Sequence, residues 1–218
     1  NSIDGDIQNH PQLNANVPWA HYDIWVVKFN SKNQIEWQKE IGGSLDEKGF
    51  SISQTLDGGY IIGGYTNSFA LNDALLRGDV TYDGRFGNGD HSVIGWVIKL
   101  DLNGNKQWDK TFSRGNSEII RSIIQTKDKG YIFAATSDDP QKSYSDIWVV
   151  KVNEKGDMEW DKTYGSTKND FATKVIQTID DGYAVLGTVN SNDGDVSLNV
   201  LPNWGGTWLL KLGKKGDK

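Results

Sequence analysis

The residues best suited to chemistry in this chain are aspartates that flank or follow a glycine in short loop motifs. The motif occurs as Asp4-Gly5-Asp6, as Gly78-Asp79-Val80 and as Asp193-Gly194-Asp195. Closely spaced carboxylates and backbone carbonyls around a glycine can form the oxygen cage that Ca²⁺ prefers. The motif therefore predicts calcium binding by Asp4, Asp6, Asp79, Asp193 and Asp195, with further oxygens from Gln8, Asn9, Asn88, Asp90 and Asn199. The same motif also makes tight turns without a metal, and both interpretations stay open.

Aromatic residues share these loops with the acidic motifs. The predicted ligand-binding set is Trp19, Tyr22, Tyr82, Phe86 and Trp204. Exposed Trp and Tyr side chains suit sugar rings and protein partners, because they combine a large apolar area with a polar group. The alternative interpretation is that these rings form small apolar clusters inside long loops.

Catalytic residues are not indicated by the sequence. The three histidines, His10, His21 and His91, lie in loops at unrelated positions. A sialidase site would need a cluster of arginines, but the arginines do not recur at equivalent positions. No Gly-rich phosphate loop joins a strand to a helix. Carboxylates are so frequent that no glycosidase pair stands out. The sequence predicts a protein that is not an enzyme.

The bulk properties exclude several other classes. The net charge of −6 argues against a nucleic-acid partner, which would need a basic patch. No run of 18 apolar residues is present, so no membrane-spanning helix is predicted. The chain has no cysteine, which rules out disulfides and thiolate metal sites.

Internal repetition determines how these loops must be positioned. A first landmark, with the pattern Trp-x-x-Lys, occurs at 23–28, 95–99, 146–151 and 207–211. A second, centred on another Trp, occurs at 36–39, 107–110 and 159–162, and a third, ending in Gly-Tyr, occurs at 57–60, 128–131 and 180–183. Their order never changes, so the chain is built from repeated units.

Each unit is predicted to form four antiparallel strands. In the segment 120–164, four apolar runs are separated by the turns 127–130 and 153–157 and by one longer loop. Glycine and asparagine in the short turns supply the positive φ angles that hairpins need. The second and third strands are apolar on both faces, as in 24–27, and such strands must be covered on both sides. The fold class is therefore predicted to be all-β, with blades of a β-propeller; a β-prism or a β-solenoid is the alternative.

The unit boundaries follow from the landmarks. We predict a partial unit 1–41, a unit 42–112, a unit 113–164 and a partial unit 165–218, with two, four, four and three strands. This is about three and a quarter blades. The chain is thus predicted to be a single repeat domain or a fragment of a larger propeller, completed by further blades of the same protein or by a second copy. Seven tryptophans in the strands are expected in the core: Trp25, Trp37, Trp96, Trp108, Trp148, Trp160 and Trp208.

Strand alternation places the loops on two faces. The short turns between strands one and two and between strands three and four share one face. The links between strands two and three lie on the other face and vary most in length: they span 66–95, 137–145 and 189–206, and the segment 1–22 is of the same kind. Binding residues are frequent in variable loops that a rigid scaffold positions, so we expect the functional residues on the link face.

The units resemble a repeat of large secreted bacterial proteins that often end in a type IX secretion sorting domain. The resemblance rests on the segments 191–196, 35–44 and 54–60 and covers essentially the whole chain. It implies a secreted or cell-surface protein and no catalytic residues. The segment 100–108 also resembles the turn motifs of sialidase Asp-boxes and quinoprotein propellers, where that motif is structural.

The sequence thus predicts an extracellular binding or adhesion module that contacts a glycan or a protein through its long loops, with Ca²⁺ stiffening them. Two alternatives remain. One is a structural spacer in a large surface protein or filament, and the other is part of a secreted hydrolase.

Overall fold

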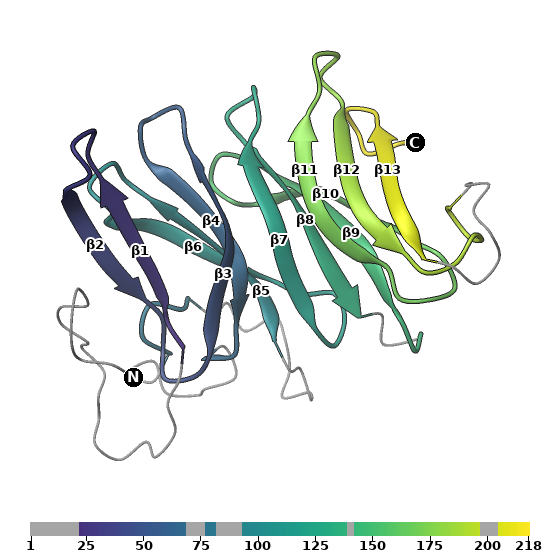
Figure 1. Ribbon diagram of the computed structural model, residues 1–218, viewed down its shortest axis with the longest axis horizontal. Helices are drawn as coiled ribbons and strands as arrows, with labels where there is room; N and C mark the ends of the chain where they lie inside the picture. The colour runs from purple at the N-terminus through teal and green to yellow at the C-terminus, as the bar shows by residue number, and fades with distance from the viewer. Residues whose placement is uncertain (1–21, 69–76, 82–92, 139–141, 197–204) are drawn as a thin grey trace.

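The computed structural model describes residues 22–68, 77–81, 93–138, 142–196 and 205–218, and its thirteen named elements are all β-strands (Figure 1). Their bounds are β1 Ile24–Phe29, β2 Ile35–Ile41, β3 Glu47–Gln54, β4 Tyr60–Thr66, β5 Ile94–Leu100, β6 Lys106–Phe112, β7 Glu118–Gln125, β8 Tyr131–Asp138, β9 Ser145–Val152, β10 Met158–Tyr164, β11 Phe171–Gln177, β12 Tyr183–Val189 and β13 Gly206–Leu212.

The strands form four antiparallel sheets, each of which we treat as one unit. The first unit is β1–β2, the second is β3–β6, the third is β7–β10 and the fourth is β11–β13. Within each sheet, strands that follow one another in sequence are also neighbours in space. The prediction of an all-β fold with four-stranded antiparallel sheets is confirmed. The sheets stand side by side and do not close into a ring within the described residues (Figure 1).

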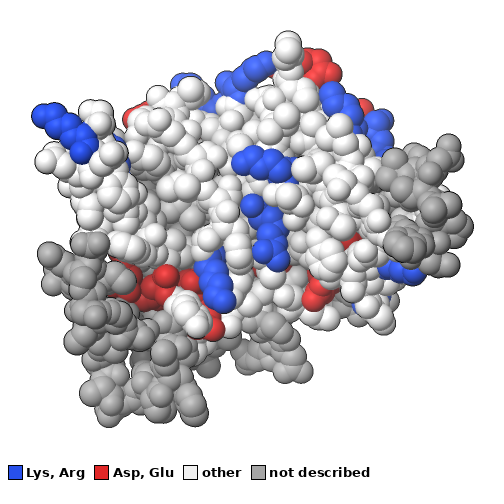
Figure 2. Space-filling model, viewed as in Figure 1, with Lys and Arg blue, Asp and Glu red and all other residues white. Residues whose placement is uncertain are grey.

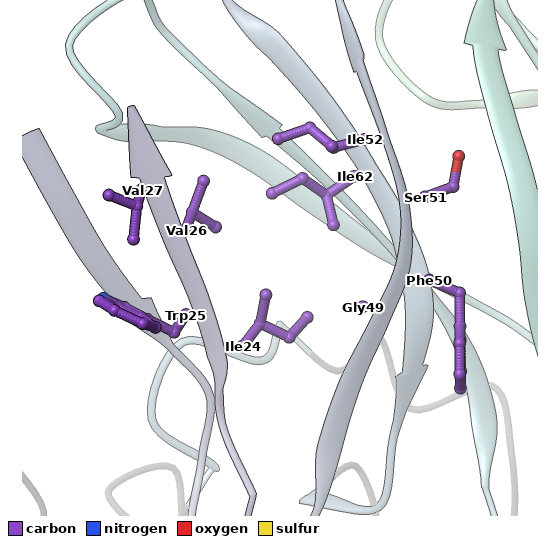
Figure 3. A pocket seen from close by; sticks show the side chains of 9 residues that line it. All are labelled: Ile24, Trp25, Val26, Val27, Gly49, Phe50, Ser51, Ile52 and Ile62. Atoms are coloured by element: carbon purple, nitrogen blue, oxygen red, sulfur yellow. The ribbon is translucent and has the colours of Figure 1, made fainter. Parts of the chain in front are cut away.

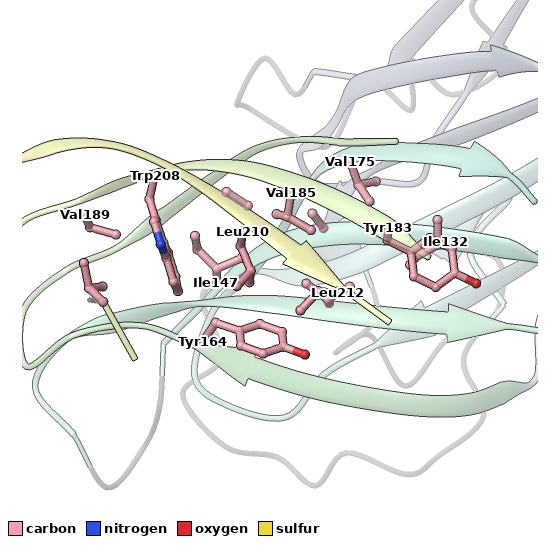
Figure 4. Packing of buried hydrophobic residues seen from close by; sticks show 14 residues of the cluster. Ile132, Ile147, Tyr164, Val175, Tyr183, Val185, Val189, Trp208, Leu210 and Leu212 are labelled. Carbon is pink, nitrogen blue, oxygen red and sulfur yellow. The ribbon is translucent and has the colours of Figure 1, made fainter. Parts of the chain in front are cut away.

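The core lies between the units, as expected for strands that are apolar on both faces. Every residue of β5 and of β9 is buried. One apolar layer joins the first and second units, another joins the second and third, and the largest joins the third and fourth (Figure 4). Because each inner sheet contributes to two layers, the units stabilise one another across both faces.

Each boundary between units repeats one aromatic contact. A Trp of strand four packs against the Tyr that begins strand two of the next unit. The pairs are Trp37–Tyr60, Trp108–Tyr131 and Trp160–Tyr183, with ring centroids 5.6, 5.7 and 5.9 Å apart. Each Trp also lies against a glycine of the turn that follows strand three in the next unit, at Gly104, Gly156 or Gly216. These contacts fix how far one unit is shifted along its neighbour.

The tryptophans of strand three occupy equivalent positions but differ in burial. Trp96 and Trp148 are 0% and 1% exposed, whereas Trp25 is 45% exposed. The expectation that all strand tryptophans lie in the core is therefore wrong for Trp25. Trp96 packs in the layer between the first and second units, so this position faces the preceding unit. No sheet of the described residues precedes the first unit, and Trp25 stays uncovered.

A lysine at the end of strand three ties each sheet to its own turn between strands one and two. Lys99 Nζ lies 2.8 Å from Asp57 Oδ2, and Lys151 and Lys211 make the equivalent ion pairs with Asp128 and Asp180. Hydrogen bonds from Lys99 and from Thr55 lower the pKa of the Asp57 carboxyl to about 2. The aspartate of this turn thus holds a lysine, largely buried in the second and third units, in addition to shaping the turn.

Candidate functional site: the face of the links

The links between strands two and three all leave the scaffold at the same end. Strand two ends and strand three begins at the lower edge of the sheets in Figure 1, and the short turns lie at the upper edge. The loops between strands four and one share the lower edge, as the predicted alternation of faces requires. Three sets of carboxylates organise the described part of this face.

The first set consists of a buried carboxylate at or just before the start of strand one. Glu47 accepts hydrogen bonds from Gly43 N–H at 2.8 Å and from Thr66 Oγ1 at 2.5 Å. Glu118 accepts from Gly115 N–H at 2.7 Å and from Ser137 Oγ at 3.2 Å. Each carboxylate therefore joins the loop between strands four and one to the start of a link.

Asp170 has the same role in the fourth unit. It accepts hydrogen bonds from Ser166 N–H and, at 3.1 Å, from Asn190 N–H. Burial raises the pKa of Asp170 and also that of Glu118. Burial of a carboxylate costs free energy, and the hydrogen bonds to Asp170 and Glu118 offset part of that cost. This indicates that the two groups are important for the fold of this face.

The second set consists of the aspartates at the end of two acidic motifs. Asp79 N–H donates to Gly42 O at 2.9 Å, and Gly42 N–H donates to Asp79 Oδ2 at 3.3 Å. Asp195 and Gly165 make the same two bonds, at 2.9 and 3.4 Å. We call these two contacts the link anchors. Each fixes one point within a link to the strand-four end of the preceding unit.

The third set is formed by the carboxylates around Asp23, at the start of β1. Figure 2 shows acidic side chains gathered on this side of the molecule, at the lower left of the view. Burial, together with the negative charges of Glu47, Glu40 and Asp79, raises the pKa of Asp23 to about 7. A proton shared in this region would relieve the repulsion among the carboxylates.

The predicted calcium ligands have the following places in the structure. Asp79 and Asp195 form the link anchors, and Asp193 accepts hydrogen bonds from Thr167 N–H and Oγ1 at 2.8 and 2.6 Å. Those bonds lower the pKa of Asp193. Asp4 and Asp6 lie outside the described residues. Among the described residues no three His, Cys, Asp or Glu side chains are grouped so that they could hold a metal ion, and calcium binding stays a prediction.

Of the predicted ligand-binding aromatics, the structure describes Tyr22 alone. Its ring is 62% exposed, and Lys48 Nζ lies 4.8 Å from the ring centroid. The other four, Trp19, Tyr82, Phe86 and Trp204, lie outside the described residues. Binding by this aromatic set stays a prediction.

Sequence analysis missed the carboxylates of the first set. A signal was present, because Glu47 and Glu118 each stand seven residues before the recurring Gln54 and Gln125, and Asp170 stands seven before Gln177. An acidic residue that recurs at one position of a repeat, beside apolar strands, indicates a structural anchor.

Comparison with known proteins finds no family model and no curated protein that matches the chain. Among the described residues, no helix is long and apolar enough to span a membrane.

Proposed function

We propose that this chain is a non-enzymatic binding module, made of β-propeller blades, that presents the links between strands two and three to a glycan or protein partner outside the cell. The observation that supports the proposal is the repeated link anchor, Asp79 with Gly42 and Asp195 with Gly165. A link that is bound to the scaffold at one point has less conformational freedom to lose, which lowers the entropy cost of binding.

The propeller arrangement is supported by the stacking of the units. The first strands of the second, third and fourth units, β3, β7 and β11, contact one another in sequence order. Four-stranded antiparallel sheets that meet along their first strands are typical of propeller blades. The secreted or cell-surface location and the calcium ion rest on the sequence alone.

A glycan array and a pull-down from surface extracts test the proposal. We expect the parent chain to bind a partner. The variants Trp19→Ala, Trp204→Ala and Tyr22→Ala, which alter the link face, should not bind it. Leu102→Ala is the matched control, because Leu102 is 53% exposed but lies in a turn on the opposite face. A partner lost equally in the control would show that the link face is not the binding surface.

A second candidate function is a structural spacer in a larger surface protein. The repeated Trp–Tyr contact at all three unit boundaries favours it, because such contacts give rigidity without any ligand. Shortening all the links separates the two functions. A spacer would keep its stability and assembly, whereas a binding module would lose its partner and keep its fold.

A further inference from the structure

A groove of about 330 Å³ separates β1 from β3, and it is lined by apolar groups (Figure 3). Ile24 and Val26 of β1 form one wall, and Gly49 and Ile52 of β3 form the other. Ile52 is 52% exposed in this groove. In the described part of the chain β1 pairs with β2 alone, so its other edge offers backbone N–H and C=O groups to a further strand.

The next two units show what covers the same position. Ile123 and Val175 correspond to Ile52 in strand one, and both are 0% exposed. Strand two of the preceding unit covers Ile123, because a Cβ placed on Gly63 would lie 3.0 Å from Ile123 Cγ2. The groove is therefore the place where strands one and two would lie if the first unit were complete.

The polar contacts at these junctions are also repeated. Ile123 N–H donates to Ser51 Oγ at 3.1 Å, and Val175 N–H donates to Ser122 Oγ at 3.2 Å, so a serine of the preceding strand one binds each backbone. Ile52 occupies the corresponding position beside the groove.

The turn between strands one and two adds a further contact. Gln125 Oε1 accepts a hydrogen bond from Leu56 N–H at 2.7 Å, and Gln177 Oε1 accepts one from Lys127 N–H at 2.9 Å. Gln54 is the equivalent glutamine of the second unit and is exposed. It stands where the turn of a preceding hairpin would donate its backbone N–H.

The lysine at the end of strand three adds a charged contact to this comparison. Lys99 and Lys151 pair with the aspartate of their own turn between strands one and two, and their side chains are 4% and 2% exposed. Lys28 is the equivalent lysine of β1, pairs with Glu36 at 2.6 Å, and is 33% exposed. An aspartate in the turn of an added hairpin would complement the Lys28 ammonium.

We propose that the groove between β1 and β3 binds a two-stranded β-hairpin of the repeat's own type. Its strand one carries a serine at the Ser51 position, its turn carries an aspartate at the Asp57 position, and its strand two carries Gly or Ala at the Gly63 position. The second of its strands extends the β1 sheet through main-chain hydrogen bonds, and the hairpin continues the interface that β3, β7 and β11 already form.

The test adds a synthetic hairpin with the sequence of residues 47–66 to the full chain. Glu47 and Thr66 are paired in the native hairpin, so the peptide is cyclised head to tail, which removes the marginal stability of an isolated hairpin as a cause of failure. Calorimetry measures the affinity of the peptide for the chain, and hydrogen exchange measures how strongly the β1 amides are protected. We expect saturable binding and exchange of the β1 amides slowed about tenfold or more.

A double-mutant cycle gives the specific signature. Asp57→Asn in the peptide and Lys28→Met in the chain should each weaken binding about tenfold, and together no more than either alone. Lys32→Met is the matched control, because Lys32 is an exposed lysine in the turn after β1. The proposal is overturned if the cyclic hairpin leaves β1 exchange unchanged. It is also overturned, in favour of a second copy, if the chain alone self-associates, protects β1 and excludes the peptide.

Discussion

The indole Nε1 of Trp96 donates a hydrogen bond to Asp109 Oδ2 across 2.9 Å, and so joins the middle of strand three to strand four. Trp148 and Asp161 repeat the bond at the same distance in the third unit. Asp109 is 5% exposed and also accepts bonds from Thr81 N–H and Oγ1, both at 2.7 Å. The Asp109 carboxylate therefore connects strands three and four to Thr81 in the link between strands two and three.

Asp109→Ala should lower the free energy of unfolding by about 3 kcal/mol, because it leaves the buried indole and the Thr81 groups without their acceptor. Asp161→Ala is the matched control: Asp161 is exposed, and its loss should cost about 1 kcal/mol. Denaturant titration measures both values. Equal losses in the two variants would show that the link contact adds nothing.

Removing both acidic partners of Lys151 should strongly destabilise the third unit. Lys151 is 2% exposed and pairs with Asp128 at 3.0 Å and with Glu159 at 2.9 Å. The variant Asp128→Ala/Glu159→Ala leaves a buried ammonium without a counter-charge, which should cost about 3–5 kcal/mol.

The control for this prediction is Glu36→Ala in the first unit. Lys28 is one-third exposed, so water replaces its lost partner and the free energy of unfolding should change little. Thermal and denaturant unfolding measure both. A small loss in the double variant would mean that water reaches Lys151 and replaces its partners.

Two glycines with the same backbone angle separate conformational strain from packing. Gly58 and Gly156 both have φ +81°. A Cβ on Gly58 would meet nothing nearer than 4.0 Å, whereas one on Gly156 would lie 3.0 Å from the Trp108 ring. Gly58→Ala should cost about 1 kcal/mol, and Gly156→Ala about 1–2 kcal/mol more, because the ring must move. Equal costs in chemical denaturation would show that the ring gives way freely.

Asp23 should make stability depend on pH near neutrality. Its folded pKa of about 7 lies above the ordinary 3.8, so the folded chain binds more protons between those values and stability falls as pH rises through that range. Asp23→Asn should remove this fall and raise the free energy of unfolding at pH 8 by about 1 kcal/mol, a value reduced for its partial exposure.

Asp101→Asn provides a control of opposite sign. Hydrogen bonds from Asn105 lower the pKa of Asp101, so its contribution is present above the unfolded pKa and disappears as the solution is acidified. Its substitution should lower the stability by a constant amount above about pH 4 and change the pH dependence only below that value. Superimposable profiles for Asp23→Asn and the parent chain between pH 4 and 8 would contradict the assignment.

Calcium binding predicts a stability increase with millimolar Ca²⁺ relative to a chelator, since a ligand that binds only the folded chain stabilises it. The shift in the unfolding midpoint should disappear in Asp193→Ala/Asp195→Ala. Mg²⁺ at equal concentration controls for ionic strength. No shift with the parent chain would leave Asp195 as a link anchor and Asp193 as a hydrogen-bond acceptor for Thr167 only.

The sequence predicted the sheets well because strand order depends on local signals. Gly104 and Gly156 close tight turns with positive φ, and apolar runs on both sides of them determine which strands pair. It failed for Trp25, because the residue type is the same at Trp96 and Trp148, and burial depends on a neighbouring sheet that the local sequence does not show.

The link face was predicted less completely. Its position followed from strand alternation, but the Thr66 hydroxyl reaches Glu47 only once β3 and β4 have paired. The repeat pattern shows that an acidic residue recurs at this position, but it does not show which groups that residue binds. The same holds for Gly42, whose contact with Asp79 joins residues 37 apart in the chain.

The Trp–Tyr contact between units has a consequence for how such chains can change in length. Both partners occupy fixed repeat positions, so an in-frame duplication of a whole unit would create a boundary with the same residues as those on either side. No compensating substitution would be needed elsewhere. An insertion that is not a whole unit would instead place a Trp opposite the wrong strand, so the contact favours a change in length by complete units.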